Sequence, residues 1–173
     1  MAPAPDVPYD MKTVTSKLFA AALALCPVSL FADHHGEKKA EGKKPDQEIV
    51  LECNDQMQFN KKELEIKAGT TVKLVLKHTG KLPKVAMGHN FVLLAKGTNL
   101  MTWAAGAAKP DLRENDFIPK EEKAKKAVLA NTKVIGGGEE TSITFSVKEA
   151  GDYEFLCSFP GHFAIMKGKL TAK

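Results

Sequence analysis

The chain has 173 residues, of which 43% are hydrophobic and 27% charged, and its formal net charge is +4. This length and apolar content allow one domain with a proper hydrophobic core. The positive excess gathers in lysine runs within 38–44 and 120–126, and no nucleic-acid-binding motif accompanies them. We therefore interpret the lysines as a solvated surface and predict no nucleic-acid partner.

Residues 1–32 are predicted to be an N-terminal extension followed by a cleaved signal peptide. Lys12 and Lys17 form a positively charged segment ahead of an apolar run from Leu18 to Leu30, and Ala32 ends a plausible cleavage site. The alternative is a membrane anchor, but an anchor requires about 20 apolar residues, and this run is shorter. Cys26 lies inside the run behind a bulky leucine, which argues against a lipoprotein cleavage site.

Residues 33–46 are polar and charged and lack large apolar side chains, so we expect a disordered tether. If cleavage follows Ala32, the mature chain begins with Asp33, His34 and His35. A free amine with histidine at the third position can bind Cu(II) through a square-planar set of nitrogen atoms, which Cu(II) favours. These three residues are therefore a hypothetical second copper site.

Residues 47–173 show the period-two pattern of half-buried strands. Apolar residues alternate along seven segments: Ile49–Cys53, Leu64–Ile66, Val72–Leu76, Phe91–Leu93, Ile143–Val147, Tyr153–Cys157 and Met166–Leu170. Glycines between them indicate turns. The pattern predicts an all-β fold, a two-sheet Greek-key β-sandwich of seven or eight strands. A helical insertion is expected between about 100 and 130, with a helix near Leu100–Ala108 and another from Pro119 and Glu121 to Ala130.

The most informative motif is a ten-residue stretch near the C-terminus that combines a thiol, an imidazole and a thioether. Cys157, His162 and Met166 follow the spacing C-x4-H-x3-M, and another histidine, His89, lies upstream in Met87-Gly88-His89-Asn90. One thiolate, two imidazoles and a weak axial thioether form the trigonal site that holds copper for electron transfer. A Cys–His hydrolase is the alternative, but the sequence supplies no third group to orient the histidine, and Met166 would have no role.

These residues resemble the azurins, the bacterial blue-copper proteins of the cupredoxin family. The resemblance extends over residues 47–173 and is carried by Asn54–Asn60, Leu82–Lys84, Met87–Leu93, Thr132–Gly136 and Cys157–Leu170. It implies a cupredoxin-like sandwich with one type 1 copper, and the ligands it implies are His89, Cys157, His162, Met166 and the backbone carbonyl of Gly88. Glycine at that position would let the carbonyl approach the metal closely.

The resemblance also implies roles for residues around the ligands. Asn90 is expected to tie the two ligand loops together, and the Phe159 amide to donate a hydrogen bond to the Cys157 sulfur. Pro160 is expected to stiffen the loop. An apolar docking patch for redox partners is expected around the edge of His162; it comprises Met57, Leu82, Met87, Phe159 and Pro160.

Four further residues are interpreted by comparison with the same family. His78 matches a histidine near the site that is not a ligand, and we expect a structural or modestly pH-sensitive group. Gln47 and Thr70 occupy the positions of the disulfide that azurins usually carry, so that bridge is predicted to be absent. The remaining thiol, Cys53, is predicted to be a small buried apolar residue, with an exposed reactive thiol as the alternative.

The predicted function is that of a periplasmic single-electron carrier with one copper that cycles between Cu(II) and Cu(I). The expected partners are redox proteins such as a c-type cytochrome or a periplasmic oxidoreductase. We expect a monomer without a small-molecule substrate, and therefore not an enzyme. The alternative is a protein for copper delivery or buffering, for which His34 and His35 would be relevant.

Overall fold

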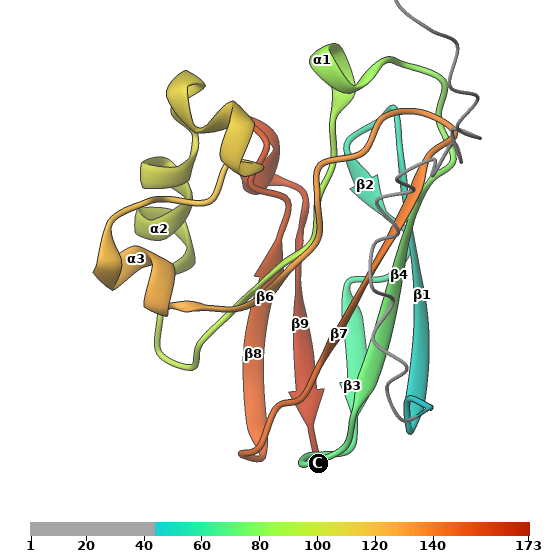
Figure 1. Cartoon of the computed structure of the whole chain (residues 1–173), viewed down its shortest axis with the longest axis vertical. Coiled ribbons are helices and arrows are strands. Elements are labelled where there is room, and N and C mark those ends of the chain that lie inside the picture. Colours follow the sequence, from blue (N-terminus) through green and yellow to red (C-terminus); the bar gives the residue numbers. More distant parts are fainter. Residues whose placement is uncertain (1–43) are drawn as a thin grey trace, which may run out of the picture. The chain divides into compact units, whose positions relative to one another are not determined.

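A computed structural model describes residues 44–173, which form nine strands in two facing sheets (Figure 1). The first sheet has the order β2–β1–β4–β7, with bounds Gln58–Phe59, Gln47–Asn54, Val72–His78 and Glu140–Phe145. The second has the order β3–β9–β8–β5–β6, with bounds Glu63–Ile66, Lys167–Ala172, Gly151–Leu156, Val92–Leu94 and Val128–Asn131. The predicted all-β sandwich is confirmed, with nine strands instead of seven or eight.

Inward-facing side chains at alternating positions fill the space between the sheets. β1 runs parallel to β4, where Leu51 lies opposite Leu76 and both are fully buried. The Phe155 ring centroid lies 5.4 Å from that of Phe91 and 5.7 Å from that of Phe59. Each such side chain stabilises the fold by roughly 1.5–3 kcal/mol when it leaves water. This core is the rigid frame that carries the loops.

Two strands, β2 and β6, lie outside the predicted set. β2 is only two residues long and pairs with the end of β1. β6 replaces the second half of a predicted helix, because α3 spans only Glu122–Lys126, and the prediction of a helix up to Ala130 is wrong. Ala130 is buried opposite Leu93 of β5, and this pairing outweighs the helix propensity of alanine and leucine.

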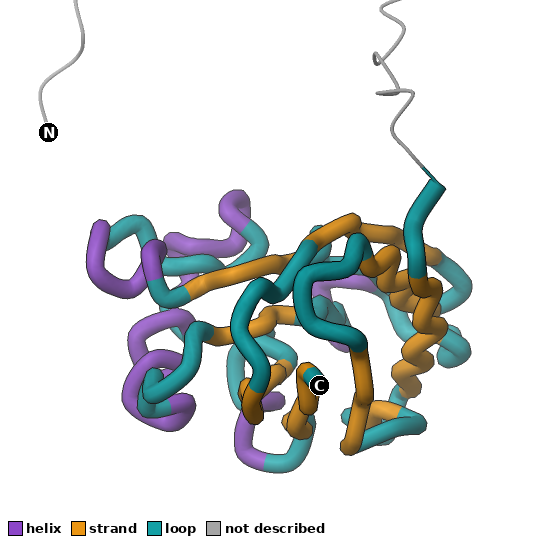
Figure 2. Tube along the Cα trace, turned by 90° about the horizontal axis from the view of Figure 1, so that it is seen from below, coloured by secondary structure: helices purple, strands orange, loops and turns teal. Residues whose placement is uncertain are grey.

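The insertion adds a second, smaller core on one side of the sandwich, where Figure 2 shows its helices grouped. It consists of α2 (Leu100–Ala107), the 3-10 helix η1 (Pro110–Asn115) and α3, and the helix predicted near residue 100 is confirmed. Trp103 of α2 is buried in the same cluster as Leu156, and its Nε1 donates to the Ala124 carbonyl at 2.9 Å. This bond joins α2 to the middle of α3.

The start of the sandwich is held by side-chain hydrogen bonds. The carboxylate of Asp46, at the end of the predicted tether, accepts from the Thr71 amide at 2.8 Å. Gln47 Oε1 accepts from the Thr70 hydroxyl at 3.2 Å, so a hydrogen bond joins the two side chains between which the sequence predicted no disulfide.

Residues 1–43 lie outside the described part of the chain, and with them the predicted signal peptide, Cys26 and the hypothetical copper site Asp33–His35. No helix within residues 44–173 is long and apolar enough to cross a membrane. Both cysteines in that range, Cys53 and Cys157, are free and buried. Cys53 donates to the Lys77 carbonyl at 3.4 Å, and burial, with a smaller contribution from Cys157, raises the pKa of its thiol. The prediction of a buried thiol is confirmed.

Candidate metal centre

Three donor side chains from distant parts of the chain meet at one end of the sandwich. His89 is held by a bridge to Ile135 just before β5, Cys157 follows β8, and His162 begins the 3-10 helix η2 (His162–Ala164). The Cys157 Sγ lies 3.8 Å from His89 Nδ1 and 3.7 Å from His162 Nδ1, and the two nitrogens are 3.1 Å apart. All three side chains are buried.

The geometry of these donors fits a small transition-metal ion. From the three distances, one point lies about 2.1 Å from all three atoms, close to metal bonds of about 2.0–2.1 Å to imidazole and about 2.3 Å to thiolate. His89 Nε2 donates to the Asn54 carbonyl at 2.9 Å, so its Nδ1 carries a lone pair directed toward that point. Thiolate favours Cu(I) and imidazole also suits Cu(II), so the set fits copper in both oxidation states.

Burial controls the protonation of the three donors. It raises the pKa of the Cys157 thiol to about 12, although the amides of Asn90 and Phe159 hydrogen-bond the sulfur and act in the opposite direction. It lowers the pKa of His89 to about 4, with a further contribution from His162, and lowers that of His162 to about 4. At neutral pH the three donors without metal are a thiol and two neutral imidazoles, and metal binding must release the thiol proton.

Asn90 connects the two ligand segments directly. Its Oδ1 accepts from the Ser158 amide and its Nδ2 donates to the Ser158 hydroxyl, both at 2.8 Å. Nδ2 also donates to the Asp116 carbonyl at 2.8 Å. Because Asn90 follows His89 and Ser158 follows Cys157, these bonds hold the two donors at a fixed separation.

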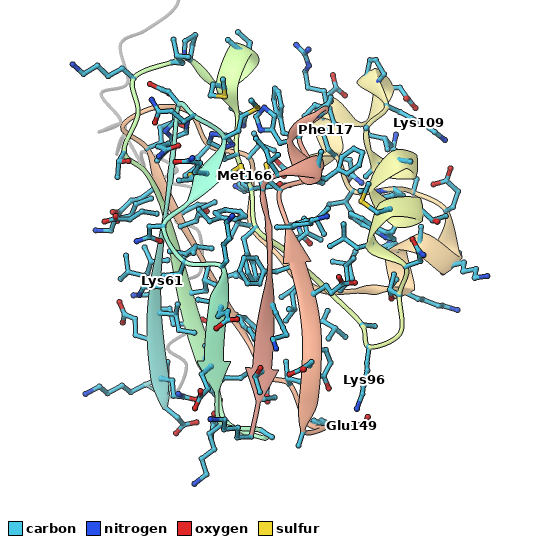
Figure 3. The ribbon with its side chains drawn as sticks, turned by 180° about the vertical axis from the view of Figure 1, so that it is seen from behind. Lys61, Lys96, Lys109, Phe117, Glu149 and Met166 are labelled. Carbon is cyan, nitrogen blue, oxygen red and sulfur yellow. The ribbon has the colours of Figure 1, made fainter. Side chains whose placement is uncertain are left out.

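Met166, the expected axial thioether, is 1% exposed and is tied to both neighbouring ligands through the backbone. Its carbonyl accepts from the Cys157 amide at 2.9 Å, and its amide donates to the His162 carbonyl at 2.8 Å. Figure 3 shows Met166 toward the end of the sandwich opposite Glu149. The sequence spacing and the turn around η2 thus bring Met166 back toward the donors.

Two glycines shape the turns around the ligands. At Gly88 an added Cβ would lie 2.6 Å from the Lys84 carbonyl and 2.8 Å from the Phe159 ring, so a side chain is excluded. Gly161, with φ of 85°, adopts the left-handed conformation that starts η2 and turns His162 inward. Both turns therefore depend on the absence of a side chain.

His78 lies behind His89 and is not a free donor. The Gly80 amide donates to His78 Nδ1 at 3.0 Å, so Nε2 carries the proton and donates to the Met87 carbonyl at 3.0 Å. The His78 and His89 ring centroids are 4.6 Å apart. Because both nitrogens are engaged, His78 supports the ligand by packing, in agreement with the structural role expected from the sequence.

An apolar surface borders the site. Its most exposed large side chains are Leu82, Val85 and Ile165, at 42%, 68% and 54%. Among the other residues predicted for the docking patch, four are half-buried: Met57, Met87, Phe159 and Pro160. The Phe159 and His162 ring centroids are 4.7 Å apart, which brings this surface against a ligand. Val85, on α1 (Lys84–Met87), and Ile165 were not predicted, because no sequence pattern separates an exposed apolar residue in so short an element from a buried one.

Three residues that hold the ligands were also not assigned from the sequence. The Asn54 carbonyl accepts from His89, and Ser158 donates its amide to Asn90 Oδ1 and accepts from Asn90 Nδ2 through its hydroxyl. Asp116 accepts from Asn90 although it lies 26 positions away in the chain. The position of Ser158 next to Cys157 could have indicated its role from the sequence. No neighbouring residue or motif indicates the role of Asp116.

A two-sheet sandwich with buried Cys–His–His donors at one end defines a cupredoxin-type copper protein. The sequence comparison is more specific: the chain belongs to the plastocyanin/azurin family of copper-binding proteins, whose profile matches residues 46–173. The resemblance noted from the motifs is thereby confirmed, and copper is the metal that the donors fit.

Relatives of known sequence and structure agree with this assignment. Azurin of Alcaligenes faecalis is 46% identical over 127 residues, which cover 71% of this chain and 95% of that protein. The outer membrane protein H.8 of Neisseria gonorrhoeae is 44% identical over 128 residues, 70% of this chain and 65% of that protein. The solved structure of an azurin from Methylomonas sp. strain J matches with a TM-score of 0.64 at 31% identity, covering 74% of this chain and 98% of that one. Auracyanin B matches with a TM-score of 0.65 at 29% identity, covering 76% and 92%.

Proposed function

We propose that the chain is a periplasmic one-electron carrier with a single type 1 copper held by His89, Cys157 and His162. Met166 and the Gly88 carbonyl would complete the set of ligands. The observation that carries the proposal is the convergence of three buried donors at 3.1–3.8 Å from one another. When bound, copper supplies the Cu(II)/Cu(I) couple.

The residues around the donors would hold the three ligands in one arrangement while the copper changes its oxidation state. The Asn54 carbonyl fixes the His89 ring, and the Asn90–Ser158 bonds fix the two ligand segments. The amides of Asn90 and Phe159 direct partial positive charge at the Cys157 sulfur and favour its thiolate form. A frame that does not rearrange keeps the structural cost of electron transfer small.

Partner docking is proposed at the apolar surface that borders His162. His162 is 4% exposed and packs under the half-buried Phe159, so a partner that covers Leu82, Val85 and Ile165 comes close to a ligand ring. Small apolar contacts suit redox encounters, which must dissociate quickly. The proposed partners are a c-type cytochrome or a periplasmic oxidoreductase. We propose that the copper protein binds them as a monomer. Export is proposed from the signal peptide predicted within residues 1–32.

Copper delivery is the less favoured function because the donors are enclosed. Cys157 and His89 are 0% exposed, so an acceptor protein could reach the metal only after the site opens. An electron can pass through the His162 ring without such opening. The burial of the donors therefore favours electron transfer over metal transfer.

The decisive experiment is an absorption spectrum of the purified protein after addition of Cu(II). An intense band at about 600 nm that bleaches with a reductant and returns with an oxidant is expected for thiolate-bound type 1 copper. A weak, pale spectrum would contradict the proposed site. It would indicate that copper binds at another place in the chain.

The docking surface has its own test, Val85→Asp. Val85 is 68% exposed, so the folded protein tolerates the carboxylate, but a partner must desolvate it. We expect electron transfer to a soluble c-type cytochrome to slow about tenfold, which corresponds to about 1.4 kcal/mol. Leu129→Asp is the matched control, since Leu129 is also exposed but lies on β6. Equal rates for both variants would argue against docking at Val85.

A further inference from the structure

Two consecutive residues of the insertion, Asp116 and Phe117, adopt left-handed backbone conformations, with φ of 52° and 56°. Aspartate tolerates this region, but for a bulky side chain such as phenylalanine the conformation is rare and unfavourable. Strained backbone of this kind persists only where the surrounding contacts enforce it, and it is frequent at functional sites. The contacts of both residues lead to the copper ligands.

Asp116 forms hydrogen bonds with both segments that carry ligands, through Asn90 and Ser158, and with Val134. Its carbonyl accepts from Asn90 Nδ2 at 2.8 Å and from the Ser158 hydroxyl at 3.4 Å. Its carboxylate Oδ1 accepts from the Val134 amide at 2.7 Å. Val134 precedes Ile135, the bridge partner of His89. One residue of the insertion thus contacts the segments that carry two of the three donors.

Phe117 supports Phe159, the residue that contacts both Cys157 and His162. It is 2% exposed, and its ring meets that of Phe159 edge-on, with centroids 5.1 Å apart and an interplanar angle of 69°. Phe159 in turn donates its amide to the Cys157 sulfur and packs against the His162 ring. Figure 3 shows Phe117 and Met166 on the same half of the molecule, away from Glu149.

The end of η1 explains only part of this arrangement. The Asp116 amide donates to the Arg113 carbonyl at 3.3 Å and the Phe117 amide to the Leu112 carbonyl at 2.9 Å, which is an ordinary way to end a helix. Such an ending needs one left-handed residue, usually glycine. It requires neither the Asp116 carboxylate nor a second left-handed residue with an aromatic ring.

We propose that Asp116 and Phe117 are positioning residues through which the helical insertion fixes the copper site. Asp116 holds the Asn90–Ser158 connection, and Phe117 holds Phe159, so together they set the two amides that face the Cys157 sulfur. This inference rests on the proposed function for its effect on copper, but its structural part does not. Loosening these contacts leaves more negative charge on the sulfur, which favours Cu(II) and lowers the reduction potential.

The first test is amide hydrogen exchange in the metal-free protein. Asp116→Gly permits the same φ but removes the carboxylate that accepts from the Val134 amide. We expect the Ser158 amide of this variant to exchange at least about tenfold faster than in the parent protein. Asp116→Asn keeps a side-chain oxygen for the Val134 amide and a residue that tolerates φ above zero, so it should restore slow exchange. Glu114→Ala, an exposed carboxylate of the same 3-10 helix, is the control and should change nothing.

The second test uses the copper-loaded variants. For Asp116→Gly and Phe117→Leu we expect a lower reduction potential, an altered ratio of the two sulfur-to-copper absorption bands and loss of copper to a chelator about tenfold faster. Asp116→Asn and Glu114→Ala should match the parent protein. Unchanged Ser158 exchange together with unchanged spectra in Asp116→Gly and Phe117→Leu would overturn the inference. Asp116 and Phe117 would then do no more than end η1. A parent protein without the blue band would overturn the proposed function, while the exchange rates would still decide the positioning role.

Discussion

The ligand segment from Cys157 to Met166 and the insertion from 100 to 127 contribute to the site in different ways. The ligand segment supplies chemical groups, and its role follows from residue types at short spacing. The insertion supplies contacts: Asp116 reaches Asn90 across 26 positions and Ser158 across 42. The difference shows that donors can be recognised from a local motif, whereas a distant supporting residue such as Asp116 is identified only by its contacts in the folded chain.

The largest effect is expected from Cys157→Ser, which removes the donor itself. Without a thiolate the intense band at about 600 nm should disappear, because it arises from charge transfer between sulfur and copper. Cys53→Ala is the matched control, since both thiols are buried but only Cys157 faces the two imidazoles. The absorption spectra of the two copper-loaded variants decide the point. Loss of the band in Cys53→Ala instead would show that the wrong thiol has been assigned.

A smaller effect, on stability alone, is expected from Trp103→Ala in the insertion core. Removing this buried ring and its hydrogen bond to the Ala124 carbonyl should lower the free energy of unfolding by about 3–5 kcal/mol. The blue spectrum should persist, because Trp103 belongs to a different cluster from Cys157. Urea denaturation of the metal-free protein measures the loss.

A matched control for this stability prediction is Leu129→Ala. Leu129 is 44% exposed, so its truncation should change the free energy of unfolding by no more than about 0.5 kcal/mol. A bleached Trp103→Ala protein that remains folded would show that the insertion core, and not only Asp116 and Phe117, controls the ligands.

The smallest of these effects is the pH dependence of the metal-free protein. His89 and His162 have pKa values lowered to about 4 in the folded state, against 6.5 for an ordinary histidine. The unfolded chain therefore binds protons first as the pH falls, and stability is complete above about pH 6.5 and decreases toward pH 4. Between pH 7 and pH 5.5 we expect a loss on the order of 2 kcal/mol.

Copper should suppress this acid sensitivity, since bound imidazole nitrogens cannot accept protons until the metal leaves. Denaturation curves at several pH values, with and without copper, make the comparison. A metal-free protein equally stable at pH 7 and pH 5.5 would contradict the depressed pKa values of the two ligand histidines.

The strand pattern and the donors could be predicted because they depend on periodicity and on residue chemistry. The alternation in Ile49–Cys53 and Tyr153–Cys157 reports which face of each strand is buried, and both segments are strands in the structure, apart from Cys157, which follows β8. β6 could not be predicted, because Leu129 and Ala130 favour a helix and only pairing with β5 makes them a strand. Propensity is a weak local preference that tertiary contacts override.

By itself the sequence predicted the sandwich and the three donors His89, Cys157 and His162 that meet in the structure, because each follows from a short pattern of residue types in order. Beyond Asn90 and Phe159, which the resemblance implied, only the tertiary structure decided which groups support those donors. The Asn54 carbonyl reaches the site from the end of β1, and the Asp116 carbonyl and the Phe117 ring reach it from the end of η1. Hydrogen bonds and ring contacts depend on distance in space, and a chain that folds back on itself brings together groups that no local pattern connects.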